Sequence, residues 1–160
     1  MSAVYRLDRT QFVPRPREEL FAFFSDARNL ERITPPFLHF QVLNAGSTVV
    51  HAGMLIDYRL RLFGLRLRWQ SKIESFEPGE RFVDVQIRGP YRRWRHLHEF
   101  HDVPGGTQLI DCVEYELPWG PLGKLAQALF IRRTLKKIFD YRQHEIERLF
   151  IRSLAHSAVE

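Results

Sequence analysis

The stretch YRRWRHLHEFHD (91–102), followed by TQLIDCVEYELP (107–118), alternates between two kinds of side chain along both segments. Such alternation is typical of strands with one covered and one solvated face, and Pro104-Gly105-Gly106 between them indicates a hairpin turn. A turn centred on Pro104-Gly105 pairs the inward residues as Trp94 with Tyr115, His96 with Val113, and His98 with Asp111. A turn at Gly105-Gly106 would shift this pairing by two residues. In either register, His98 and Asp111 lie close together on the inward face, whereas His101 lies on the charged outer face with Glu99.

Three alternating segments precede this hairpin and are separated by turn signals: GMLIDYRLRL (53–62), LRLRWQSKIESF (65–76) and RFVDVQIR (81–88). A two-residue turn at Phe63-Gly64 pairs the inward residues as Tyr58 with Trp69 and Leu60 with Leu67. A turn at Gly89-Pro90 pairs them as Val85 with Trp94 and Val83 with His96. The segments therefore predict an antiparallel sheet with one largely apolar face.

Further segments flank this sheet. VYRLDRTQFV (4–13) and FLHFQVL (37–43) read as strands, and REELFAFFSD (17–26) and ARNLERITPP (27–36) as short helices. GPLGKLAQALFIRRTLKKIFDYRQHEIERLF (120–150) carries an apolar stripe at helical spacing. The predicted fold class is α+β, in which a curved antiparallel sheet of about six to seven strands is wrapped on a long C-terminal helix. Two short helices follow the first strand. We expect a single domain, 1–160, with a core of about 4–152.

Composition narrows the class of protein. The 160 residues are 44% hydrophobic, which is typical of a globular chain. Cys112 is the single cysteine, so no internal disulfide is possible. The first ten residues contain charged side chains and no apolar core, unlike a signal peptide. No apolar run approaches the ~20 residues of a membrane span. We therefore expect a cytoplasmic protein without membrane insertion.

The net charge of +5 raises the question of an anionic partner. Arginines alternate with apolar residues along the strands, as on the solvated face of a sheet, and no nucleic-acid-binding motif accompanies them. We expect no nucleic-acid partner. A basic patch on the last helix could meet an anionic surface, although a solvated helix face is the simpler interpretation; it comprises Arg132, Arg133, Lys136 and Lys137.

Aromatic and polar residues share the inward face of the predicted sheet. Apolar walls with a few convergent polar groups are typical of a small-molecule pocket, although aromatic residues also pack simply as core. The candidate ligand-binding residues are Tyr58, Trp69, Ser71, Trp94, His96, His98, Phe100, Asp111 and Tyr115.

The two inward histidines allow sharper hypotheses. His96-x-His98 could bind a metal if Asp111 served as a third ligand, since Cys112 points to the other face. Hydrogen-bonded histidines are the favoured interpretation, and we predict neither metal nor cofactor. His98 and Asp111 are also candidate catalytic residues, as a general base and its orienting carboxylate; the alternative is a buried pair that fixes the register of the sheet.

The element order, with FFSDARNLERITPP (23–36) and the hairpin RGPYRRWRHLHEF…GGTQLIDCVEYELPWGPLG (88–100 and 105–123), resembles the START-like superfamily. This superfamily of SRPBCC, or helix-grip, proteins includes polyketide cyclase/dehydrase-type domains. The resemblance extends from about Tyr5 to Phe150 and is closest to small stand-alone bacterial ligand-binding members. It implies an apolar ligand held between the sheet and the C-terminal helix, and it carries over no catalytic motif.

We therefore predict that the protein binds a small, largely apolar molecule of aromatic, polyketide-like or lipidic character. One alternative is an enzyme of cyclase, dehydratase or hydrolase type that uses His98 and Asp111. The other is an interaction module that uses the basic surface.

Overall fold

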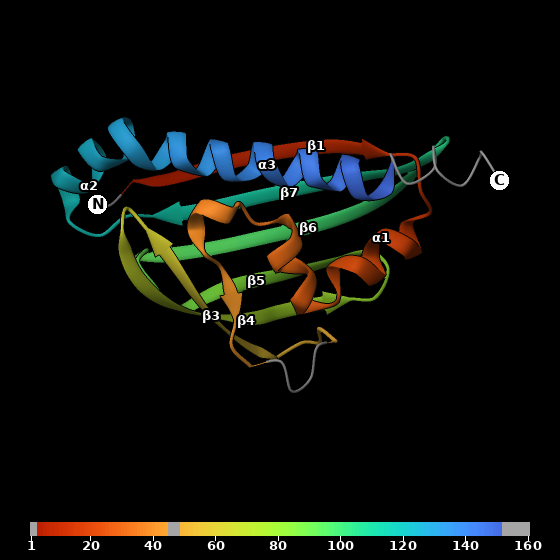
Figure 1. Ribbon diagram of the computed structural model, residues 1–160, viewed down its shortest axis with the longest axis horizontal. Helices are drawn as coiled ribbons and strands as arrows, with labels where there is room; N and C mark the ends of the chain where they lie inside the picture. Colours follow the sequence, from red (N-terminus) through yellow and green to blue (C-terminus); the bar gives the residue numbers. More distant parts are fainter. Residues whose placement is uncertain (1–2, 45–48, 152–160) are drawn as a thin grey trace.

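A computed structural model describes residues 3–44 and 49–151 as a seven-stranded antiparallel sheet crossed by a long helix (Figure 1). The strands are β1 (Val4–Val13), β2 (Gln41–Val42), β3 (Leu55–Leu62), β4 (Leu65–Glu77), β5 (Arg81–Arg88), β6 (Arg93–Val103) and β7 (Gly106–Glu116). Their order in the sheet is β1-β7-β6-β5-β4-β3-β2, so every neighbouring pair except β1–β7 is also consecutive in sequence. This α+β arrangement is the predicted helix-grip fold.

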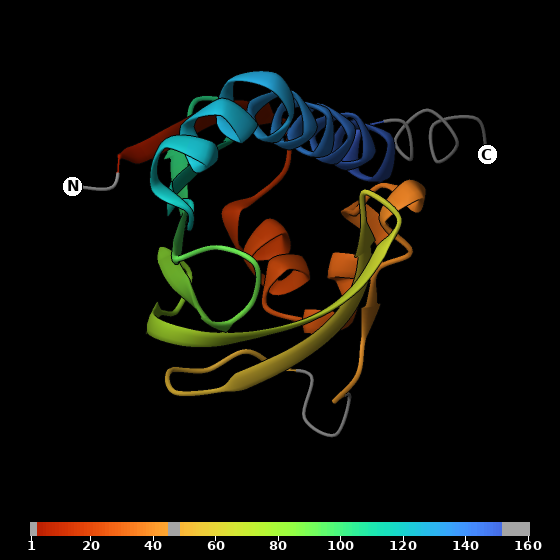
Figure 2. The same cartoon turned by 90° about the vertical axis from the view of Figure 1, so that its left-hand side faces the viewer.

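The helices cover one face of the curved sheet. Helix α1 (Arg17–Phe24) and two 3-10 helices, η1 (Ala27–Ile33) and η2 (Pro36–Leu38), follow β1. The C-terminal helix consists of α2 (Gly120–Ala126), a π-helical turn η3 (Gln127–Ile131) and α3 (Arg132–Phe150). Seen end-on, the sheet curves around the interior, and the C-terminal helix lies across its open side (Figure 2).

The predicted strand over 37–43 is wrong for most of its length. Pro36–Leu38 forms a 3-10 turn, and only Gln41–Val42 pairs with β3. Two consecutive prolines, Pro35 and Pro36, favour this turn, because each fixes φ and lacks an amide proton. The segment therefore folds over the cavity side of the sheet, where Leu38 is buried.

Two of the three predicted hairpin registers are confirmed. Tyr58 pairs with Trp69, as the turn at Phe63-Gly64 predicts. His98 pairs with Asp111 in the register expected for a turn centred on Pro104-Gly105.

The register between β5 and β6 is wrong by one residue. Asp84 pairs with His96, and Val85 with Arg95, instead of Val83 with His96 and Val85 with Trp94. The connection is wider than a two-residue turn, since the Gln86 side chain donates to the Tyr91 carbonyl at 2.7 Å and accepts from the Tyr91 amide at 3.2 Å. A shift of one residue exchanges the two faces of a strand. The side chain of Asp84 therefore points inward, where Val83 and Val85 were expected.

The apolar core extends along the interior in three clusters. One lies beneath α1 and the end of α3, where Leu20, Phe100 and Ile146 are almost fully buried. A second gathers around Ile56 and Ile73 of β3 and β4. The third packs β7 against the middle of α3. Between these clusters, the space under α3 is incompletely filled, and the cavity described below lies there.

Candidate ligand-binding cavity

A cavity of about 180 Å³ lies between the sheet, the η1–η2 segment and the inner face of the C-terminal helix. Its walls are mostly apolar and aromatic. From the sheet and the loop after β5 they include Tyr58, Leu60, Leu62, Trp69, Tyr91 and Trp94. From the helical side they include Leu30, Ile33, Leu38, Ile131, Leu135, Ile138 and Phe139.

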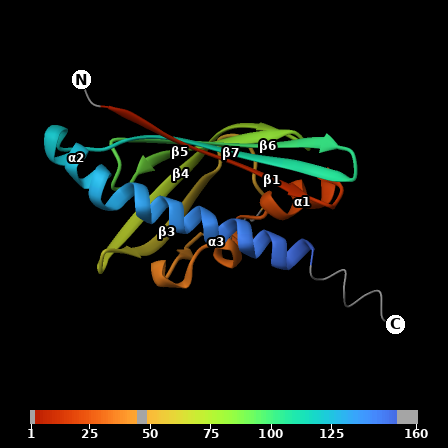
Figure 3. The ribbon, with the colours of Figure 1, turned by 90° about the horizontal axis from the view of Figure 1, so that it is seen from above.

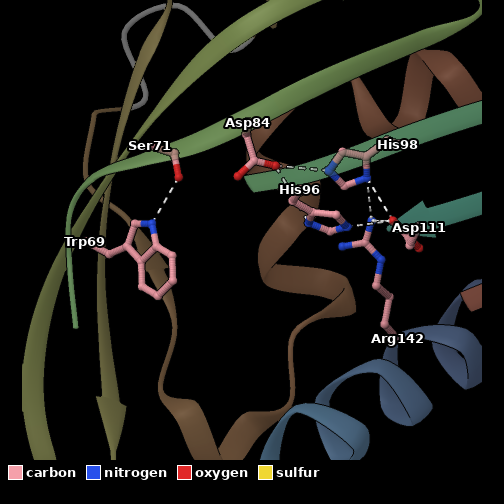
Figure 4. Close-up of polar contacts among 7 residues, drawn as sticks. All are labelled: Trp69, Ser71, Asp84, His96, His98, Asp111 and Arg142. Atoms are coloured by element: carbon pink, nitrogen blue, oxygen red, sulfur yellow. Dashed lines mark hydrogen bonds and ion pairs between the residues drawn. The ribbon is translucent and has the colours of Figure 1, made fainter. Parts of the chain in front are cut away.

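The aromatic wall is interlocked by edge-to-face contacts. The ring centroids of Trp69 and Trp94 lie 5.3 Å apart at an interplanar angle of 89°, and Tyr91 packs against both rings. The indole nitrogen of Trp69 donates to the Ser71 hydroxyl at 3.0 Å (Figure 4). This hydrogen bond satisfies a polar atom within an otherwise apolar wall.

The predicted ligand-binding residues divide into two groups. The cavity wall contains Tyr58, Trp69, Ser71, Trp94, His96 and His98. Phe100 lies outside it, in the cluster beneath α1. Tyr115 is not part of the wall but packs against two of its aromatic residues, Tyr91 and Trp94. Asp111 is buried directly behind the histidines. Inward orientation on the sheet is therefore correct for all of these residues, but the cavity occupies only part of that face.

A polar cluster closes one end of the cavity. It comprises Asp84 of β5, His96 and His98 of β6, Asp111 of β7 and Arg142 of α3 (Figure 4). His96 Nε2 lies 2.9 Å from Asp111 Oδ1, and His98 Nδ1 lies 2.9 Å from the same oxygen. On the opposite side, His98 Nε2 lies 3.1 Å from Asp84 Oδ2. The predicted partnership of His98 with Asp111 is thus present, and each carboxylate contacts more than one partner.

His98 is held in a position that favours its charged form. Burial opposes the imidazolium, but hydrogen bonds from both ring nitrogens to Asp111 and Asp84 outweigh it, and the pKa of His98 is raised. The ring stacks on Phe82 at a centroid distance of 4.3 Å, which leaves it little freedom to turn. A histidine that donates from both nitrogens has no lone pair with which to accept a proton.

His96 has the opposite tendency. Burial and the neighbouring His98 charge lower the pKa of His96 to about 4, against the stabilising effect of Asp111. The neutral ring donates from Nε2 to Asp111, so Nδ1 carries the lone pair. The two imidazoles lie only 3.8 Å apart between ring centroids. Two charged rings at that separation would repel each other.

Arg142 completes the charge balance of the cluster. Its Nη2 donates to Asp111 Oδ1 at 3.3 Å, and its guanidinium lies 5.0 Å above the Phe24 ring. Arg142, followed by the two histidines, keeps the pKa of Asp111 well below its usual range despite burial. Two carboxylates therefore face one guanidinium and one imidazolium, and the cluster is neutral overall. Arg142 Nε is buried and has no hydrogen-bond partner among the described residues.

Asp84, Arg142 and Tyr91 were not among the candidates from the sequence. Asp84 was missed because the assumed two-residue turn placed it on the outer face. Arg142 follows Leu135 and Phe139 at helical spacing and precedes Ile146. Its position within the apolar stripe could therefore have been recognised from the sequence. A charged residue in such a stripe indicates a buried partner of opposite charge.

The cluster also resembles a metal site in one respect. Asp84, His96 and His98 bring one potential ligand atom each within 4.8 Å of one another. The third residue differs from the sequence hypothesis, which used Asp111. A cation there would have to displace the proton that His98 shares with Asp84.

Comparisons with known proteins agree with this architecture. Residues 13–138 match the family described as polyketide cyclase / dehydrase and lipid transport. No curated protein matches the chain. Among the described residues, no helix is long and apolar enough to cross a membrane.

Solved structures show the same fold. A protein from Chromobacterium violaceum is 15% identical, with a TM-score of 0.68 over 92% of this chain and 96% of that one. A norcoclaurine synthase mutant from Thalictrum flavum, crystallised with a transition-state analogue, is 11% identical, with a TM-score of 0.65 over 92% and 97%. A nucleoside-diphosphate sugar epimerase from Corynebacterium glutamicum is 28% identical, with a TM-score of 0.60, over 88% of this chain and only 28% of its own.

The START-like fold predicted from the sequence is thus shared by proteins of very different sequence. The family match covers most of the chain, from the end of β1 into α3, and includes the strands and helices that form the cavity. The chain belongs to the polyketide cyclase / dehydrase and lipid transport family.

Proposed function

We propose that the protein binds one small, largely apolar molecule in the cavity, with an uncharged polar group of that molecule directed at the Asp84–His96–Arg142 end. The observation that carries this proposal is that an aromatic wall and a neutral polar cluster border the same cavity. Hydrophobic enclosure supplies affinity, and a few convergent polar groups fix the orientation of the ligand.

The size of the cavity limits the apolar part of the ligand. An apolar cavity of about 150 Å³ takes up a benzene-sized molecule, and the cavity here measures about 180 Å³. One aromatic ring, or a short aliphatic segment, fills it. A longer ligand would extend beyond the cavity wall, which includes Leu62 of β3 and Ile131 of the C-terminal helix.

The charge balance limits the polar part. A ligand carboxylate or ammonium would add an uncompensated charge to a buried and already neutral cluster, which costs several kcal/mol. A hydroxyl, phenol or carbonyl adds none. Asp84, whose side chain is 18% exposed, can accept a hydrogen bond from such a group. This contact favours phenolic or hydroxylated ligands.

Native mass spectrometry of freshly purified protein, repeated after denaturation, tests this proposal. We expect a co-purified molecule that is lost on denaturation and that is retained less by Trp94→Ala. Phe12→Ala is the matched control, because Phe12 is 51% exposed and lies outside the cavity wall. A protein of bare polypeptide mass, or equal loss from both variants, would contradict the proposal.

Proton-transfer catalysis is a second candidate function, favoured by the two His–Asp contacts at the cavity end. The charged His98 would serve as the acid, whereas the low pKa of His96 makes it a weak base at neutral pH. This assignment makes His98 the acid, whereas the sequence analysis proposed it as a general base oriented by Asp111. Incubating the identified ligand with protein would reveal a product that differs by one water. His98→Gln should abolish this product while the ligand remains bound, and unchanged turnover would exclude the role.

A further inference from the structure

Large apolar side chains are exposed together at one end of the molecule. Between β7 and α3 they are Trp119, Leu122, Leu125, Leu129 and Phe130, with exposed fractions from 47% to 71%. The α2–η3 segment carries them on its solvent side. An exposed apolar surface of this kind marks a binding surface more often than the scattered single residues of an ordinary protein surface.

The turn between β3 and β4 extends this surface. Its tip exposes Phe63 and Leu65 at 59% and 67%, and the Phe63 ring lies 6.2 Å from the Phe130 ring, edge to face. In Figures 1 and 3, this turn and α2 lie at the same end of the molecule, the end that faces the viewer in Figure 2. We call these seven residues the docking face.

Two of its aromatic residues occupy a backbone conformation that disfavours them. Phe63 and Trp119 have φ angles of 51° and 72°, in the left-handed region where glycine or asparagine is normally found. Both side chains are solvent-exposed, so packing within the fold does not compensate for the backbone strain. Their presence is better explained by a surface that contacts something else.

The charges around the docking face have one sign. Residues 117–139 contain no acidic residue, and their cations are Lys124, Arg132, Arg133, Lys136 and Lys137. Residues 58–73 contain none either, and their cations are Arg59, Arg61, Arg66, Arg68 and Lys72. All of these cations are exposed. Across the β3–β4 ladder, Arg59 lies opposite Arg68 and Arg61 opposite Arg66, an arrangement that is unfavourable unless anions stand nearby.

Lys136 pairs with Asp140 at 2.6 Å, but for five of the arginines the described residues supply no such partner. In the described part of the chain, no carboxylate lies within 4.0 Å of a side-chain nitrogen of Arg61, Arg66, Arg68, Arg132 or Arg133. The partner must therefore combine an apolar interior with a negatively charged surface. An anionic lipid bilayer has both, and each Lys or Arg near its headgroups contributes about 1 kcal/mol.

Other partners fit less well. A second copy of this chain would bring like charges together, which opposes association. Nucleic acid would supply anions, but the exposed leucines, Leu65, Leu122, Leu125 and Leu129, have no counterpart on a phosphate backbone or a stack of bases.

The docking face also borders the cavity wall. Leu62 and Ile131 line the cavity, and each is the direct neighbour of an exposed aromatic residue, Phe63 or Phe130. We propose that this face docks peripherally on anionic membranes, with its apolar side chains among the headgroups, and that ligand passes between the bilayer and the cavity there. The passage of ligand rests on the function proposed above, whereas the docking does not.

Vesicle flotation tests the docking. Vesicles of phosphatidylcholine and phosphatidylglycerol at 7:3 should carry the protein, vesicles of pure phosphatidylcholine should carry it poorly, and added salt should release it. Phe130→Ser should lower the bound fraction about tenfold. Phe12→Ser is the matched control, because Phe12 is 51% exposed and lies near Gly105, in the turn between β6 and β7.

Tryptophan fluorescence provides a second measurement. Vesicle binding should shift the emission to shorter wavelength, and Trp119→Phe should remove most of the shift. Absence of binding to 7:3 vesicles would overturn the proposal. So would a concentration-dependent dimer in sedimentation that Phe130→Ser abolishes without any effect on flotation.

The two proposals fail separately. Trp94→Ala should lose the co-purified ligand in native mass spectrometry and still float with vesicles, whereas Phe130→Ser should float poorly and still bind phenol, a soluble and uncharged probe of one aromatic ring. Flotation that disappears in Trp94→Ala as well would show that docking is not a property of the docking face alone.

Discussion

At the scale of single residues, the charge balance of the polar cluster depends on which of its two histidines is protonated. His96 and His98 occupy equivalent inward positions on one strand. Both ring nitrogens of His98 lie within hydrogen-bond distance of a carboxylate, whereas His96 Nδ1 lies 3.7 Å from Asp84 Oδ2. Alternation along β6 predicts their orientation, but their protonation depends on Asp84, Asp111 and Arg142, which come from other elements. Two residues of one type in one strand therefore have opposite acid–base character.

His96 should make the protein sensitive to acid. Because its folded pKa is lowered to about 4, its contribution to stability is present above the unfolded value of 6.5 and is lost as the pH falls toward 4. His98, whose pKa is raised, contributes stability that grows as the pH falls toward 6.5 and is nearly constant below it, which offsets part of the loss; the two carboxyl groups matter only at lower pH. Guanidinium unfolding should show a net loss of at most about 2 kcal/mol between pH 7 and pH 5.

The variant His96→Asn should be less stable at pH 7 but should lose much less stability between pH 7 and pH 5. His101→Asn, on the outer face, should retain the wild-type slope. An unchanged pH slope in His96→Asn would assign the acid sensitivity to another group.

Arg142 should be far more important to the fold than a surface arginine on the same helix. Removing it leaves Asp111 buried with reduced compensation, and breaking a buried pair of this kind costs about 3 to 5 kcal/mol. Arg148, which pairs with Glu145 at 52% exposure, should contribute little, because solvent screens an exposed ion pair. Comparison of Arg142→Met with Arg148→Met by chemical denaturation measures the difference, and similar losses in both would contradict the cluster's role.

At the scale of elements, a tight turn fixes which residues of two strands pair, and therefore whether alternating side chains are assigned to the correct face of the sheet. Phe63-Gly64 has positive φ at both residues, as a two-residue hairpin turn requires, so counting outward from it aligns β3 with β4 correctly. No such constraint holds between β5 and β6, where Gln86 and Tyr91 stabilise a wider loop. Counting across that loop assigned the wrong face to Asp84.

Replacing Phe63 by asparagine should separate folding from docking. Asparagine tolerates the left-handed conformation, so Phe63→Asn should stabilise the protein by about 1 kcal/mol. The same change removes an apolar side chain from the docking face and should weaken vesicle flotation. Thermal unfolding and flotation of one sample measure both effects. A variant that is destabilised would show that Phe63 packs within the fold after all.

The sequence predicted the elements better than the site. The strands from β3 to β7 and the long C-terminal helix were found, because apolar periodicity is a local property. The cavity required information that is not local: the curvature of the sheet, the wide loop after β5, and the position of Arg142 opposite Asp111. The π-helical turn at Gln127–Ile131 had no readable signal, since the apolar stripe passes through it.

At the scale of the whole molecule, the core and the cavity share one set of elements. The three apolar clusters lie along a single sheet under a single long helix, and the cavity is bordered by residues of all three, including Ile33, Tyr58 and Phe139. A ligand in the cavity therefore contacts both layers. Binding to the folded state alone stabilises it by mass action.

Removal of the co-purified molecule should accordingly lower the Tm. Protein refolded from guanidinium after passage over a hydrophobic resin should unfold roughly 5 to 10 °C below protein as purified, as expected for a ligand at about 100 times its Kd. Trp94→Ala should show little difference between the two preparations. Equal Tm values for both wild-type preparations would indicate an empty cavity.

The pairing of β1 with β7 has a consequence for how the chain folds. β1 is hydrogen-bonded along its length to a strand about a hundred residues later, and the cluster under α1 is completed by Ile146 and Phe150 of α3. The hairpins from β3 to β7 need only local loop closure, whereas β1 and α1 must wait for the most distant contacts, which lose the most chain entropy. Refolding should therefore begin in the central meander, and its slowest step should join the two ends of the polypeptide.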